Sequence, residues 1–166
     1  MSLAETRRLF TEAFNLFVRL GWDAKVGNAT KLHYLAYYRV RESLPNLNSN
    51  LINTARAKAS EALRSAFALQ EQERKVTMPQ SNACPPRYNV HTYRVDWEGQ
   101  TVRVSLVGAR QTIRFAIPNY CAHYAGYPVD TADLISRDGV WWLHVVVSVP
   151  APDVEPTDEI VGVDGV

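Results

Sequence analysis

The stretch MPQSNACPP, residues 78–86, divides the chain into two parts with different sequence patterns. The consecutive prolines Pro85 and Pro86 exclude a helix, because proline lacks a backbone N–H and restricts the residue before it. Before this stretch, apolar residues recur with helical spacing, and after it they alternate as in strands. The sequence therefore predicts an α+β chain with a small helical bundle over residues 1–80 and a β block over residues 86–150.

Three helices are predicted in the N-terminal block. The first covers residues 3–20 and stops at Gly21. The second follows a cap at Thr30 and ends near Pro45, and the third runs over about residues 51–74. The apolar face of this third helix is narrow and rich in alanine, which allows a partner helix to approach closely. Three helices with short connections form a small bundle.

Antiparallel hairpins are predicted in the β block. Apolar and polar residues alternate over residues 89–107 on both sides of Gly99, and a third strand ends at Pro118. A second hairpin turns at Asp138-Gly139, a dipeptide that favours tight turns between hydrophobic runs. About five antiparallel strands indicate an antiparallel β-barrel or a strongly curved sheet.

The C-terminal residues predict the beginning of a further domain. Residues 151–159 are an acidic, proline-rich linker, and the chain ends on IVGVDGV, residues 160–166. This β-branched run predicts a strand that carries Asp164. A single strand cannot form a domain, so the sequence predicts a truncated chain. The strand–Asp–Gly pattern also occurs in ATPases of the actin-like class, which need a second phosphate-binding hairpin that this sequence does not show.

Composition and charge limit the class of protein. The chain is 46% hydrophobic and 21% charged, as in ordinary globular proteins. It has no apolar run of about 20 residues, no apolar signal segment and only two distant cysteines, which together favour a cytoplasmic protein. The net charge is +1, but residues 1–85 carry +5 and residues 151–166 carry −5. The basic part suggests an anionic partner, and the alternative is a solvated helical surface.

Four stretches in a fixed order carry a resemblance to a known family. They are GNATKLHYLAYYRVRESLPNLNSNLINTARAKASEALRSA (27–66), YNVHTYRVDWEGQTVRVSLVGARQTIRFAIP (88–118), ADLISRDGVWWLHVVVSVP (132–150) and EIVGVDGV (159–166). In turn they resemble the helical recognition segment, the β-barrel wedge region, the last barrel hairpin and the opening strand of the RuvC-like nuclease domain of the TnpB-like proteins. These are transposon-associated RNA-guided DNA endonucleases related to type V CRISPR effectors.

The resemblance implies a metal-dependent nuclease from which most of the catalytic site is missing. In that family the first catalytic aspartate lies on the opening strand, so Asp164 would be both a catalytic residue and a ligand of Mg²⁺. Two metal ions between several carboxylates position a water and stabilise the leaving oxygen of a phosphodiester. The remaining carboxylates of the family lie beyond residue 166. We therefore expect this chain alone to be catalytically inactive and to need no cofactor.

The resemblance also implies that the chain binds guide RNA and the RNA–DNA heteroduplex formed with target DNA. In such effectors the protein recognises the shape and backbone of the duplex, while base pairing reads the sequence. Cations for phosphates and a tyrosine for bases are present in both blocks. The candidate nucleic-acid-binding residues are Lys31, Tyr34, Arg39, Arg41, Arg56, Lys58, Arg64, Arg94, Arg103, Arg110 and Arg114.

Other interpretations of the same sequence remain open. The chain could be a repurposed, non-catalytic nucleic-acid-binding regulator, or a protein-interaction module that uses residues 160–166 as an edge strand. Cys84, His91, Cys121 and His123 are residue types that bind zinc, but their spacing matches no usual zinc finger, which favours scattered structural residues. Trp141 and Trp142 are adjacent on a strand and are predicted to point to opposite faces.

Overall fold

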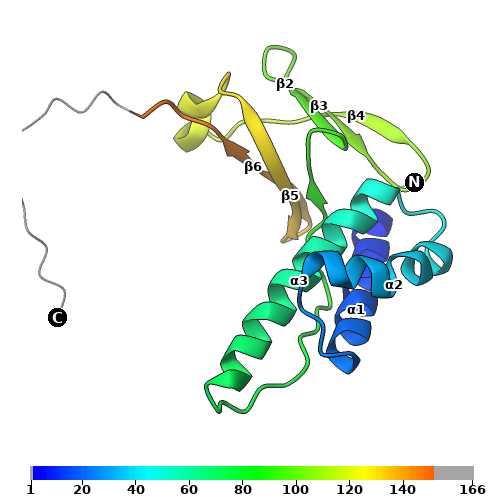
Figure 1. Cartoon of the computed structure of the whole chain (residues 1–166). Helices are drawn as coiled ribbons and strands as arrows, with labels where there is room; N and C mark the ends of the chain where they lie inside the picture. The colour runs from blue at the N-terminus through cyan, green and yellow to red at the C-terminus, as the bar shows by residue number, and fades with distance from the viewer. Residues whose placement is uncertain (1, 152–166) are drawn as a thin grey trace, which may run out of the picture.

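The computed structural model describes residues 2–151 and shows an α+β chain (Figure 1). Three helices form the N-terminal bundle, and two antiparallel three-stranded sheets follow it. The elements are α1 (Leu3–Asp23), α2 (Ala29–Ser43), α3 (Ser49–Glu71), β1 (Arg87–Tyr88), β2 (Tyr93–Asp96), β3 (Thr101–Ser105), β4 (Arg110–Arg114), the 3₁₀ helix η1 (Asn119–Tyr124), β5 (Val129–Arg137) and β6 (Val140–Val147). The predicted strand over residues 160–166, with Asp164, lies outside the described residues, as does most of the predicted linker.

The prediction of a barrel is wrong for the described residues. One sheet has the strand order β2-β3-β4 and the other the order β1-β5-β6, and no ladder joins them between residues 2 and 151. A barrel requires continuous hydrogen bonding around its circumference. Here the segment after β4 passes through Pro118 and η1 before β5 begins, so β4 remains an edge strand.

Both predicted hairpins are confirmed. β2 pairs with β3 around the turn that contains Gly99, and β5 pairs with β6 around Asp138-Gly139. Asp138 and Gly139 have φ angles of 52° and 78°, the left-handed pair that a two-residue hairpin turn requires. The two tryptophans of β6 also divide as predicted. The Trp141 ring lies under the Arg7 guanidinium, 5.0 Å from it, whereas Trp142 is exposed.

Two predicted helix boundaries are wrong. Helix α2 is capped by Asn28, not Thr30, because the Asn28 side chain accepts hydrogen bonds from the backbone N–H groups of Thr30 and Lys31. Helix α1 does not stop at Gly21 but continues to Asp23. Gly21 is instead a position of close approach, where the side chain of Leu63 on α3 occupies the space beside the glycine.

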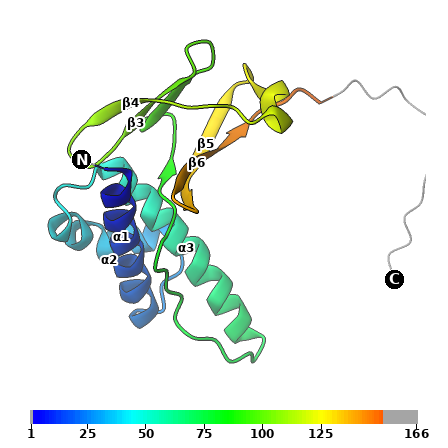
Figure 2. The ribbon, with the colours of Figure 1, turned by 180° about the vertical axis from the view of Figure 1, so that it is seen from behind.

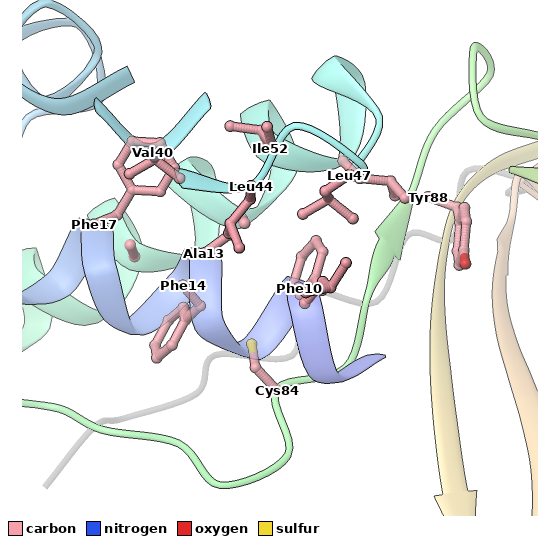
Figure 3. Close-up of a cluster of buried hydrophobic side chains, with 14 of the residues drawn as sticks. Phe10, Ala13, Phe14, Phe17, Val40, Leu44, Leu47, Ile52, Cys84 and Tyr88 are labelled. Carbon is pink, nitrogen blue, oxygen red and sulfur yellow. The ribbon is translucent and has the colours of Figure 1, made fainter. Parts of the chain in front are cut away.

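Apolar side chains from all three helices fill the bundle. Phe10 and Phe17 of α1 point into this cluster, whereas Phe14, also buried, points to the other side of the helix (Figure 3). Helix α2 contributes Leu32, Ala36 and Val40, whereas Leu35 and Tyr38 are exposed. Helix α3 contributes the predicted alanine-rich face, with these members buried: Leu51, Ile52, Ala55, Ala59, Leu63 and Ala66.

The bundle and the sheets share one hydrophobic core. After α3 the chain runs back along the bundle beside α1 and then enters β1 (Figure 2). Asn15 fixes this return segment through two hydrogen bonds with the Ser81 backbone. Tyr93, Val104 and Leu134 of the sheets belong to the same cluster of buried side chains as the helices. The sheets are therefore held against the bundle by continuous packing.

Replacing Tyr88 with phenylalanine is expected to raise the free energy of unfolding by about 1 kcal/mol. The Tyr88 side chain is fully buried, and its hydroxyl has no hydrogen-bond partner among residues 2–151, so it is an unsatisfied polar group. Burial also raises the pKa of this hydroxyl. Tyr93→Phe is the matched control, because the Tyr93 hydroxyl donates to the Asp130 carbonyl at 3.2 Å. Urea denaturation should show opposite signs for the two variants, and a loss of stability in both would contradict the prediction.

Candidate nucleic-acid interface

The β2-β3-β4 sheet brings four of the predicted arginines onto one face. Residues directly opposite each other in an antiparallel ladder point to the same side. Arg94 of β2 lies opposite Arg103 of β3, and Arg103 lies opposite Thr112 of β4. Arg110 and Arg114 lie two residues before and after Thr112 on β4, so their side chains point to the same side as that of Thr112. We call this surface, formed by Arg94, Arg103, Arg110, Arg114, Asp96, Thr101, Ser105 and Thr112, the arginine face.

The arginine face is strongly positive and, apart from the buried Ser105, faces solvent. Arg94, Arg103 and Arg114 are exposed and make no hydrogen bond or ion pair within the described part of the chain. Arg110 is also exposed, but it is partly fixed because it donates to the His91 carbonyl at 2.7 Å and to Ser105 Oγ at 3.3 Å. Of the eight side chains, Asp96 alone is acidic, and one of its oxygens accepts from the Gly99 N–H. With strands about 4.8 Å apart and a rise of about 3.3 Å per residue, the four arginines cover roughly 10 by 13 Å.

The fold does not require arginine at positions 94, 103 and 114, where the side chains make no hydrogen bond or ion pair within residues 2–151. The opposite side of the same sheet carries Tyr93, Val102 and Val104, which are buried in the core and hold the sheet in place. Any polar residue would satisfy the solvent side. Arg94 and Arg103 are also like charges directly opposite each other, an arrangement that costs stability. The charge of this face therefore favours a functional explanation, an anionic ligand.

The predicted residues on the helices fall into two groups. Lys31, Tyr34, Arg39 and Arg64 are exposed. The others are wholly or partly engaged by the protein itself. Arg41 donates to the Leu47 carbonyl at 2.7 Å, and Arg56 is half-buried beside Tyr37. The exposed residues of α2 therefore form a second basic surface, distinct from the arginine face.

Lys58 belongs to a charged network that joins α3 to the sheet. Its side chain is only 11% exposed, and its Nζ donates to the Pro85 carbonyl at 2.9 Å and lies 3.0 Å from Asp133 Oδ1. Lys58 and Asp133 therefore form an ion pair, but the geometry at Asp133 Oδ1 does not meet the criteria of a hydrogen bond. Arg87 extends the network, with Nη1 2.7 Å from Glu61 Oε1 and Nε 3.6 Å from Asp133 Oδ1. Lys58 therefore has a structural role in attaching the bundle to β1 and β5.

Two further residues of the arginine face, Thr101 and Thr112, are absent from the residues predicted from the sequence. Thr101 and Thr112 share the arginine face and offer hydroxyl groups between the guanidinium groups. Both could have been identified by fixing the register of the hairpin at Gly99 and then continuing the alternation across all three strands. Within residues 2–151, no three His, Cys, Asp or Glu side chains are grouped in a way that could hold a metal ion.

Only one of the two free cysteines is expected to react rapidly with a thiol reagent at pH 8. Cys84 is buried, its N–H donates to Thr11 Oγ1 at 2.9 Å, and burial raises the pKa of its thiol from 9.0 to about 11. The thiolate fraction at pH 8 is then about 100-fold lower than in an exposed cysteine. Cys121 is only half-buried and should react first.

The number of protein thiols that react rapidly with a chromogenic aromatic disulfide reagent measures the difference between the two cysteines. A Cys121→Ser variant should have no rapidly reacting thiol. Two equally fast thiols in the wild-type protein would contradict the burial of Cys84.

The raised pKa of the Cys84 thiol also predicts that the protein loses stability at alkaline pH. A raised pKa means that the fold favours the neutral thiol, so this contribution is present below pH 9 and is lost as the pH rises to about 11.

Comparison with known proteins adds no assignment. Among residues 2–151, no helix is both long and apolar enough to cross a membrane. No family model matches the chain, and a search of curated proteins finds no significant match.

Proposed function

We propose that this chain is a nucleic-acid-binding module that holds an RNA-containing duplex through the arginine face. The observation that carries the proposal is the register of the β2-β3-β4 sheet, which places Arg94, Arg103, Arg110 and Arg114 together on one exposed surface. Guanidinium groups bind phosphates bidentately and remain charged at all physiological pH values. A cluster of four across three strands can contact several phosphates at once.

The geometry favours recognition of the backbone rather than of bases. The arginines stand on a short three-stranded sheet, and Arg110 is restrained by its hydrogen bonds to His91 and Ser105. Contacts of this kind position a duplex without reading its sequence. An RNA–DNA heteroduplex recognised by its backbone is the ligand that the resemblance to TnpB-like proteins suggests, with guide RNA and target DNA as partners.

The nuclease part of the proposal rests on the resemblance alone. In a longer parent protein, Asp164 would provide one carboxylate for Mg²⁺, and the other carboxylates would come from residues that this sequence does not contain. The chain as given is proposed to bind without cleaving. A non-catalytic regulator of the same lineage would use the same arginine face, so the binding experiment below applies to both.

Fluorescence anisotropy with labelled RNA–DNA heteroduplex tests the proposal. Binding by three to four arginines should give micromolar affinity at 50 mM salt and a slope of log K against log salt of about −3. Random-sequence duplexes should bind equally well, because backbone contacts carry no sequence information. The absence of binding at 50 mM salt, or an affinity that does not change with salt, would exclude the arginine face as a phosphate-binding surface.

A further inference from the structure

A cluster of four aromatic rings lies along one side of α2. His33 stacks on Tyr37 with ring centroids 4.7 Å apart and an interplanar angle of 26°. Tyr34 packs edge-on against His33 at 5.6 Å, and Tyr38 packs edge-on against Tyr37 at 5.4 Å. We call these four residues the aromatic ladder. The inner rings support the outer ones, so the ladder is an ordered surface.

The outer rings of the ladder are unusually exposed. Tyr34 is 81% exposed and Tyr38 is 76% exposed. The helix does not need them for its core, because Leu32, Ala36 and Val40 already cover its buried side. Two rings that are ordered by neighbours but left in water are typical of an aromatic binding surface.

Cations surround the aromatic ladder. Lys31 precedes it on α2 and Arg39 follows it, and both are exposed and form no ion pair within the described part of the chain. Arg56 of α3 borders the ladder: burial lowers its pKa, while the nearby Tyr37 opposes that shift. Exposed aromatic rings between unpaired cations are the combination with which proteins bind single-stranded nucleic acid.

We infer that the aromatic ladder binds unpaired nucleotides, with Tyr34 and Tyr38 stacking on bases and Lys31 and Arg39 contacting the adjacent phosphates. The inference deepens the proposed function and rests on it for the class of ligand. Bases within a duplex cover each other's faces, so only an unpaired base can stack on a tyrosine ring. Tyr34 and Tyr38 are four residues apart, about 6 Å along the helix axis. This is nearly twice the spacing of stacked bases, about 3.4 Å, and fits an extended strand.

The double variant Tyr34→Ala/Tyr38→Ala tests the inference. The probe is a single-stranded oligonucleotide that contains 2-aminopurine, whose fluorescence is quenched when it stacks on an aromatic ring. The wild-type protein should quench it, and the variant should lose quenching and bind the strand about tenfold to 100-fold more weakly. The slope of affinity against salt should not change, because no cation is removed. Both side chains are exposed, so thermal unfolding should match that of the wild-type protein.

Two further variants make the experiment specific. Tyr120→Ala removes an equally exposed tyrosine, 78% exposed, from η1, and should have no effect on strand binding. Tyr34→Phe/Tyr38→Phe keeps the rings and should bind like the wild-type protein, which separates stacking from hydrogen bonding by the hydroxyls.

The outcomes distinguish this inference from the proposed function. If the wild-type protein binds heteroduplex but the alanine variant binds the single strand as tightly as the wild type, the inference is overturned and the arginine face stands. If neither form of nucleic acid binds, both proposals are overturned. If the alanine variant changes only the elution volume in size-exclusion chromatography, the aromatic ladder is a protein–protein surface and the inference is overturned.

Discussion

Replacing Gly21 with alanine is expected to lower the free energy of unfolding by about 2 kcal/mol. In an exposed helix the same change stabilises by about 1 kcal/mol, so the expected sign is reversed. An added Cβ at Gly21 would lie 2.5 Å from Leu63 Cδ1, 2.7 Å from the Val26 carbonyl oxygen and 3.0 Å from Leu32 Cδ1. The Val26 oxygen belongs to the backbone, in a loop fixed by the hydrogen bond from the Val26 N–H to the Gly21 carbonyl at 2.7 Å. It cannot move aside as a side chain would.

Gly99→Ala is the matched control for this prediction. The atoms nearest to a Cβ at Gly99 belong to the Asp96 carboxylate, which can rotate away, and Gly99 has no positive φ angle. The change in stability there should be within about 0.5 kcal/mol. Urea denaturation followed by circular dichroism measures both variants. If Gly21→Ala is as stable as the wild-type protein, α1 and α3 do not approach each other as closely as the structure shows.

Gly21 also shows where local sequence rules fail. A glycine after an amphipathic run predicts the end of a helix, yet α1 continues through it because packing against Leu32 and Leu63 decides the outcome. The Asp138-Gly139 turn was predictable because both required φ angles are properties of the dipeptide itself. Features set within a few residues were therefore predictable, and those set by distant contacts were not.

The arrangement of the strands follows the same division. Alternation within each strand predicted the two hairpins, because their partners are adjacent in sequence. The pairing of β1 with β5 joins Arg87 to Asp133 across more than forty residues, and no local pattern indicates it. Whether the strands close into a barrel or form two sheets depends on such distant pairings. The barrel prediction was wrong for that reason.

The candidate site was predictable in residue type but not in its grouping. Every lysine and arginine can be read from the sequence, but the sequence does not show which of them form ion pairs or hydrogen bonds within the fold. Lys58 pairs with Asp133, a residue of the other block, and Arg41 binds the Leu47 carbonyl after the helix has ended. The common face of Arg94 and Arg103 depends on the hairpin register, which is fixed only when the turn is fixed.

Replacing Arg94, Arg103 and Arg114 with glutamine is expected to weaken heteroduplex binding about 100-fold at 100 mM salt. Each lost phosphate contact lowers the magnitude of the salt slope by about 0.9, so the slope should fall by about 3. The control is Arg74→Gln/Lys75→Gln/Arg137→Gln, which removes the same charge from exposed positions outside the arginine face. Equal losses in both triple variants would show that net charge, not the arginine face, determines binding.

The stability of the variant with all three glutamines separates a binding role from a structural one. Arg94 and Arg103 repel each other across the β2-β3 pair, so removing both charges should keep the free energy of unfolding unchanged or raise it by about 0.5 kcal/mol. A variant that binds weakly because it is misfolded would instead unfold at lower urea concentration. Weak binding together with unchanged or raised stability therefore means that the three arginines act in binding and are not needed to hold the fold. Wild-type affinity and salt slope in this variant would contradict the assignment of the arginine face.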